Sequence, residues 1–161
     1  MELELRRKQV SLVTLGTGVI LFGAWSALRT VLYIWTGPPL EIDQNASPSM
    51  LLLVKVIAFL IIGLILLAGF SLRLYIGRSA RREGMEGVQK NAYLYLSAFL
   101  LLFNFFISMS SLYFAFTRGL TGHTWLDFTV TSLVDLTSTF LLGDLLVTAR
   151  RLRKLRRQPE E

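Results

Sequence analysis

The chain has 161 residues, a net charge of +6 and a hydrophobic share of 53%, whereas soluble domains have roughly 45–50% apolar residues. It contains no cysteine and a single histidine, which excludes thiol chemistry and argues against a metal site built from protein ligands. Because the apolar residues form four blocks with the charges between them, we expect one all-α integral membrane domain over residues 1–161, with no cofactor.

Each apolar block is long enough to cross a bilayer, which takes about 20 residues in a helix. We predict a four-helix transmembrane bundle, built as two helical hairpins and followed by a basic tail over residues 150–161. The predicted helices span residues 10–35, 49–77, 92–117 and 125–149.

Cations gather before the first block, between the second and third, and after the fourth. Under the positive-inside rule, this distribution predicts a multi-pass protein of the cell (inner) membrane with both termini cytoplasmic. Binding to nucleic acid is therefore not needed to explain the positive charge. We expect the tail to bind anionic lipid headgroups at the cytoplasmic face. The candidate headgroup-binding residues are Arg150, Arg151, Arg153, Lys154, Arg156 and Arg157.

The first block carries a stripe of small residues, Gly16, Gly23 and Ala27, that permits close approach of another helix. We expect that approach within the bundle, with homodimerisation as the alternative. Arg29 lies in the same block, roughly 9 Å from its outer end at 1.5 Å per residue. Its side chain either extends to headgroups or turns inward to a carboxylate, and we favour the inward pairing because acidic partners lie at similar depth.

The second block contains Lys55 near its outer end and Arg73 near its inner end. We expect Arg73 to extend to the inner interface. Residues 78–91 follow with several charges and two glycines, which indicate a solvated cytoplasmic turn.

The third block is rich in aromatic residues, and a polar stripe follows one of its faces. Spacings of 7, 4, 3 and 4 residues place the stripe's members on one side of a helix. We expect them to make interhelical hydrogen bonds, with a water-lined path as the alternative. The stripe consists of Ser97, Asn104, Ser108, Ser111 and Ala115.

The fourth block contains three aspartates. Asp127 fits a capping box at its beginning, and Asp144 near its inner end fits pairing with the basic tail. Asp135 lies near the middle, where an unpaired carboxylate is costly. Thr131 and Thr139 lie about 40° to either side of it around the helix axis. We expect this polar face to turn into the bundle, toward the polar stripe (the serine stripe) of the third block, with Arg29 and Lys55 as partners of Asp135.

Two hypotheses account for Asp135. In the first, the chain is a membrane-embedded accessory or assembly protein whose buried charge network fixes helix register. In the alternative, it is a small ion- or proton-coupled transporter or channel that uses Asp135. We see no nucleophile–base pair and therefore expect no enzyme. The expected partners are the lipid bilayer and either a second copy or another membrane protein.

Overall fold

The computed structural model describes residues 2–36, 48–118 and 122–157, and every regular element within these ranges is a helix. In chain order, the helices are α1 (Glu2–Thr36), α2 (Pro48–Glu86), α3 (Ala92–Arg118) and α4 (Gly122–Arg157). Each of the four contains a segment long and apolar enough to cross a membrane. The predicted all-α class with four candidate membrane spans is therefore confirmed over the described residues.

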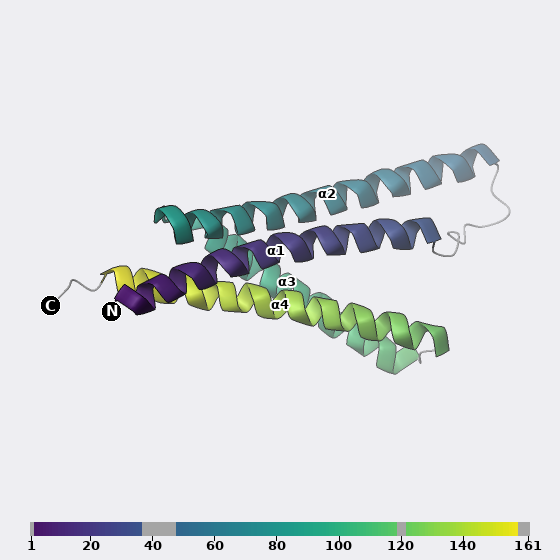
Figure 1. Cartoon of the computed structure of the whole chain (residues 1–161). Coiled ribbons are helices and arrows are strands. Elements are labelled where there is room, and N and C mark those ends of the chain that lie inside the picture. Colours follow the sequence, from purple (N-terminus) through teal and green to yellow (C-terminus); the bar gives the residue numbers. More distant parts are fainter. Residues whose placement is uncertain (1, 37–47, 119–121, 158–161) are drawn as a thin grey trace.

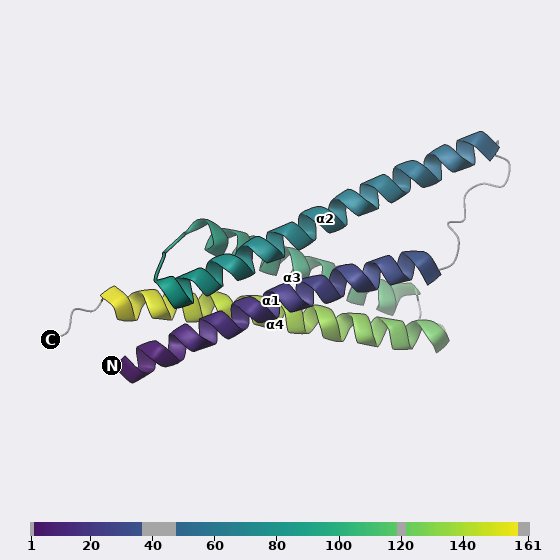
Figure 2. The ribbon, with the colours of Figure 1, turned by 45° about the horizontal axis from the view of Figure 1, so that its top comes forward.

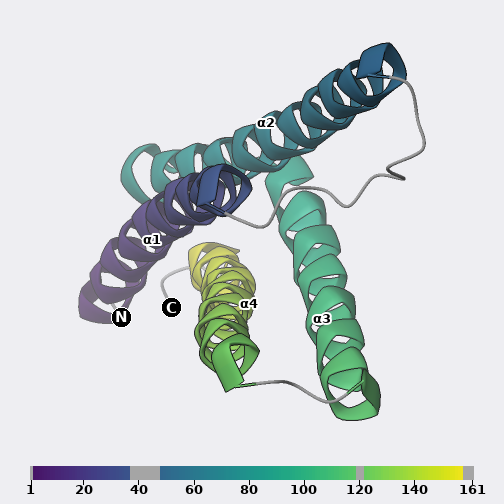
Figure 3. The ribbon, with the colours of Figure 1, turned by 90° about the vertical axis from the view of Figure 1, so that its right-hand side faces the viewer.

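Both chain termini lie at one end of the molecule, where α2 also ends and α3 begins (Figure 1). We call this the terminal end. Helix α1 contacts α2 and α4, and α3 contacts α4 and, less extensively, α2. Away from the terminal end, α2 and α3 diverge from one another (Figures 2 and 3). The bundle is thus tight at one end and open at the other.

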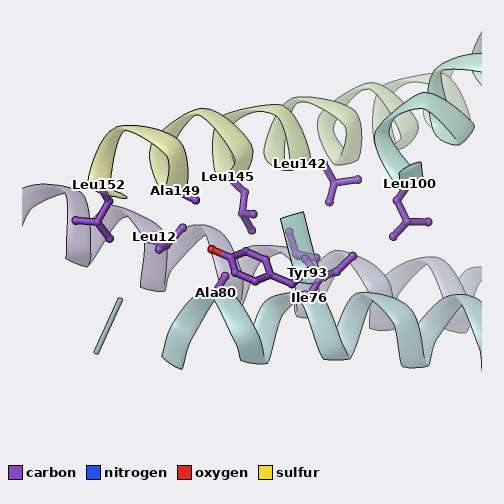
Figure 4. Packing of buried hydrophobic residues seen from close by; sticks show 10 residues of the cluster. Leu12, Ile76, Ala80, Tyr93, Leu100, Leu142, Leu145, Ala149 and Leu152 are labelled. Atoms are coloured by element: carbon purple, nitrogen blue, oxygen red, sulfur yellow. The ribbon is translucent and has the colours of Figure 1, made fainter. Parts of the chain in front are cut away.

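A compact core explains why the terminal end is tight. All four helices contribute apolar side chains to it, and the ring of Tyr93 lies in its middle (Figure 4). The contribution of α4 recurs every three to four residues, which keeps it on one helix face. The buried apolar residues are Leu12, Val19, Ile76, Ala80, Tyr93, Leu100, Leu142, Leu145, Ala149 and Leu152.

Glycines bring α1 and α2 together near this core. A Cβ on Gly16 would lie 2.8 Å from the carbonyl oxygen of Gly77, and a Cβ on Gly77 would lie 2.5 Å from that of Gly16. A Cβ on Gly84 would lie 2.7 Å from a methyl group of Val13. Since no side chain fits at these distances, the backbones can approach only through glycine. The predicted close approach of the small-residue stripe is confirmed within the bundle.

The helices extend beyond the predicted spans at the terminal end. Helix α1 begins at Glu2 rather than at residue 10, α2 continues to Glu86 rather than ending at residue 77, and α4 continues to Arg157 rather than ending at residue 149. The interpretation of residues 78–91 as a solvated turn is wrong for its first part. Its arginines face outward, while Ser79, Ala80 and Glu83 are buried, so the segment continues the packed face of α2.

Candidate functional site

A groove of about 590 Å³ lies between α3 and α4 in the open part of the molecule. This volume falls within the roughly 300–1,000 Å³ typical of ligand sites. Its apolar walls include Phe105 and Leu112 of α3 and Phe128, Leu136 and Phe140 of α4. Its polar lining consists of Ser108, Ser111, Thr131, Ser132, Asp135, Thr139 and Asp144. The prediction that the Asp135 face turns toward the serine stripe of α3 is therefore confirmed.

Asp135 is half-buried on the α4 wall of this groove. The cations whose charge acts on its carboxyl group are Arg29 of α1 and Arg73 of α2. Within the part of the chain that the structure describes, neither of them forms a direct ion pair with it. Charges interact over longer distances in a medium of low dielectric constant than in water. Two arginines of other helices thus act on the carboxyl group without an ion pair, while it remains on the groove wall.

Arg29 connects α1 to the polar face of α4. Its Nη2 donates a hydrogen bond to the Oγ1 of Thr131, one helical turn before Asp135. The Oγ1 of Thr139, one turn after Asp135, donates to the Asp135 carbonyl oxygen at 2.8 Å. The predicted inward direction of Arg29 is confirmed. Its hydrogen-bond partner, however, is a hydroxyl group beside Asp135 rather than the carboxylate itself.

Arg73 acts on Asp135 in the way we expected of Lys55. The Arg73 side chain lies against Gly23, where an added Cβ would be 3.1 Å from its Cβ and Cδ atoms. Gly23 therefore makes room for Arg73 to lie between α1 and α2. Lys55 is exposed and lies two turns into α2. The beginning of α2 diverges from the other helices (Figure 2). The divergence of α2 is the physical reason why Lys55 does not reach the site.

Among the described residues, the polar stripe of α3 does not make the interhelical hydrogen bonds that we expected. The Ser97 hydroxyl group is fully buried and donates to the Tyr93 carbonyl oxygen of its own helix at 2.7 Å. The Asn104 Nδ2 and Ser108 Oγ atoms are buried and have no partner among the described residues. Ser111 is exposed on the groove. Since an unpaired buried polar group costs about 1–3 kcal/mol, these two atoms mark a position where a polar neighbour would stabilise the protein.

A second polar cluster, which the sequence analysis did not predict, lies at the terminal end around Glu83. This carboxylate has no exposed surface. Arg153 of α4 donates to both of its oxygens, from Nε to Oε1 and from Nη2 to Oε2, each at 2.7 Å. The Tyr93 hydroxyl group of α3 also donates to Oε2 at 2.7 Å. One buried carboxylate therefore joins α2, α3 and α4.

Arg153 and a second arginine of the tail, Arg156, also bind the α2–α3 connection. Arg153 Nη2 donates to the Lys90 carbonyl oxygen at 2.8 Å, and the guanidinium group lies 5.9 Å from the centre of the Tyr93 ring. Arg156 donates to the carbonyl oxygens of Glu83 at 3.1 Å and Gly87 at 3.3 Å. It thereby satisfies carbonyl groups that the end of a helix leaves unpaired.

The candidate headgroup-binding tail therefore divides into two sets. Arg153 and Arg156 bind other parts of the protein, whereas Arg150, Arg151 and Lys154 are exposed. The side chain of Arg157 lies outside the described part of the structure, as does that of Asp127. Asp144 is exposed at the groove and forms no ion pair with a described residue of the tail.

The signal for the Glu83 cluster was present in the sequence as a spacing of small residues. Gly77, Ala80 and Gly84 recur after three and four residues, which continues one helix face through the charged segment.

In the described residues, no group of three or more His, Cys, Asp or Glu side chains is placed to hold a metal ion. Comparisons with models of known families, with curated proteins and with solved structures find no match.

Proposed function

We propose that the chain is a membrane-embedded accessory or assembly protein, and that the groove between α3 and α4 receives a polar group of a membrane-embedded partner. The main support is the buried, unpartnered Oγ atom of Ser108, which lines the groove together with Asp135. The unpartnered Nδ2 atom of Asn104 lies one helical turn before Ser108 on α3. Hydrocarbon offers no hydrogen-bond partner. A polar residue on a neighbouring transmembrane helix would bind these groups and also fill the groove.

In this proposal, the chain crosses the cell membrane as two hairpins, α1–α2 and α3–α4, and its terminal end faces the cytoplasm. Cationic residues gather at that end in three segments: the beginning of α1, the end of α2 with the α2–α3 connection, and the tail. The positive-inside rule associates such segments with the cytoplasm. The common position of the two termini (Figure 1) agrees with an even number of crossings. The open halves of α2 and α3 then lie in the outer part of the bilayer.

Photo-crosslinking in native membranes tests the accessory function. A photoreactive amino acid replaces Leu136, which lines the groove, or Leu60, a similarly exposed residue of α2 outside the groove. We expect a discrete protein adduct from position 136 and none from position 60. Asp135→Asn should decrease the adduct, whereas Asp144→Asn should leave most of it. Adducts with lipid alone at position 136 would contradict the proposal.

The alternative is a small ion- or proton-coupled transporter or channel. The size of the groove and the presence of a carboxyl group on its wall favour this second function. A proton gradient across proteoliposomes that contain the purified chain tests it with an internal pH-sensitive dye. A transporter should carry protons, and Asp135→Asn should abolish the flux without changing the melting temperature. The accessory function predicts no flux from either protein.

A further inference from the structure

A second hollow, of about 420 Å³, lies along α2 at the terminal end and on a different surface from the Asp135 groove. Three of its lining residues are cations, Arg78 and Arg82 of α2 and Lys90 of the connection to α3. One carboxylate, that of Glu86, accompanies them. The positive charges therefore outnumber the negative ones on a concave surface.

The chemical character of the hollow changes along the helix axis. Phe70, Leu74, Arg78 and Arg82 recur at intervals of four residues and follow one side of α2. The two apolar residues lie toward the middle of the membrane span, and the two arginines lie toward its end. Phe70 and Arg78 are about 12 Å apart along the axis, at 1.5 Å per residue. A ligand that fits this order has an anionic head and an apolar chain.

The three cations are available to such a ligand. Their side chains are exposed and form neither ion pairs nor hydrogen bonds with any described residue. The position of Lys90 is nevertheless fixed, because its carbonyl oxygen accepts a hydrogen bond from Arg153 at 2.8 Å. Arg153 and Arg156, by contrast, already bind groups within the protein.

We propose that this hollow binds an anionic phospholipid, with its phosphate between Arg78, Arg82 and Lys90 and an acyl chain along Phe70 and Leu74. Guanidinium groups match phosphate oxygens in geometry and charge. The negative leaflet surface supplies such lipids at the depth where a membrane helix emerges. The apolar lining selects a membrane lipid over free phosphate, although the two share the same charged chemistry.

Lipid binding to the purified full-length chain in dodecyl maltoside tests this site. Native mass spectrometry measures retained phosphatidylglycerol, and the melting temperature measures its stabilising effect. We expect binding of phosphatidylglycerol but not of phosphatidylcholine. The R78Q/R82Q variant should lose affinity by a factor of about 10 or more, because each cation near the surface contributes substantially to the attraction.

The matched control is R6Q/R7Q, which removes the same charge from exposed residues near the beginning of α1, at the same end of the molecule. It should retain most of the affinity. Equal losses in the two double variants, or no preference for phosphatidylglycerol, would overturn the proposal. If R78Q/R82Q has a lower melting temperature without lipid, Lys90→Gln in the connection serves as the second variant and should also weaken binding.

Competition experiments distinguish the two sources of the phosphate group. Inorganic phosphate and glycerol phosphate carry the charge but no acyl chain, and neither should displace phosphatidylglycerol at equal concentration. Displacement by either compound would show that the apolar half of the hollow adds nothing, which would overturn the assignment to a membrane lipid. These results do not depend on the function of the Asp135 groove.

Discussion

Among the described residues, Glu83 is the only charged residue in the buried class. Its carboxylate is fully buried and accepts hydrogen bonds from Arg153 and Tyr93. Transfer of an ionised carboxylate out of water is costly, and only a well-placed counter-charge with further hydrogen bonds offsets this cost. Because these donors come from α3 and α4, the carboxylate is satisfied in only one arrangement of the helices.

Replacement of Glu83 tests this dependence. Glu83→Gln leaves the Arg153 guanidinium group without its counter-charge and should lower the free energy of unfolding by about 3–5 kcal/mol. Denaturant-induced unfolding in detergent micelles, followed by tryptophan fluorescence, measures the change. The control is Glu86→Gln, three residues later on an exposed position, which should change the stability little.

A double-mutant cycle separates the ion pair from general damage to the helix. Arg153→Gln alone should also destabilise the protein, and the double variant should be more stable than the sum of the two single losses implies. Strictly additive losses would mean that Glu83 and Arg153 stabilise the protein independently, contrary to the geometry.

At the scale of the helices, the glycines of α2 divide into two kinds. Gly77 faces α1, where an added Cβ would lie 2.5 Å from the Gly16 carbonyl oxygen. Gly63 and Gly69 have nothing within 4 Å of an added Cβ. The same residue type therefore permits helix contact at one position and leaves only open space at the other two.

This difference predicts opposite outcomes for one kind of substitution. Gly77→Ala should force α1 and α2 apart and lower the melting temperature. Gly63→Ala should leave it unchanged or raise it slightly, because alanine is the better helix former by about 1 kcal/mol. Thermal unfolding in detergent compares the two variants with the parent chain. Equal effects would contradict the close approach at Gly77.

Hydrophobic composition predicted where the helices lie, whereas charge did not predict which charged residues are buried. Long apolar blocks located all four helices, since hydrocarbon-length segments depend on composition alone. At the end of α2, the many charges predict a solvated turn, whereas the burial of Glu83 depends on Arg153, a residue seventy positions later in the chain. The residue pattern of a helix shows which of its side chains share a face. It does not show which side chains of different helices form ion pairs.

The same limit applied to the candidate site. The angular positions of Thr131 and Thr139 about Asp135 and its orientation toward the α3 stripe followed from helix periodicity. Helix periodicity did not predict that Arg73, rather than Lys55, is the cation of α2 that acts on Asp135. This outcome results from the divergence of α2, which is a property of the whole molecule (Figure 3). The position of a cation along one helix does not specify which helices stay in contact.

The whole-molecule arrangement has one consequence that is open to direct measurement. If the terminal end is cytoplasmic, residues of the α2–α3 connection and of the tail lie on the same side of the membrane, opposite the beginning of α2. The chain has no cysteine, so a single introduced cysteine reports its own position. The exposed residues Met50, Gln89 and Arg150 provide suitable sites.

We expect a membrane-impermeant maleimide to label Met50→Cys in intact cells. Gln89→Cys and Arg150→Cys should react only after the membrane is permeabilised, because the cations around them are retained on the cytoplasmic side. The reverse pattern would invert the proposed orientation. Labelling of Gln89→Cys and Arg150→Cys from opposite sides would contradict the fold itself, since Arg153 of the tail and Lys90 of the connection are joined by a hydrogen bond.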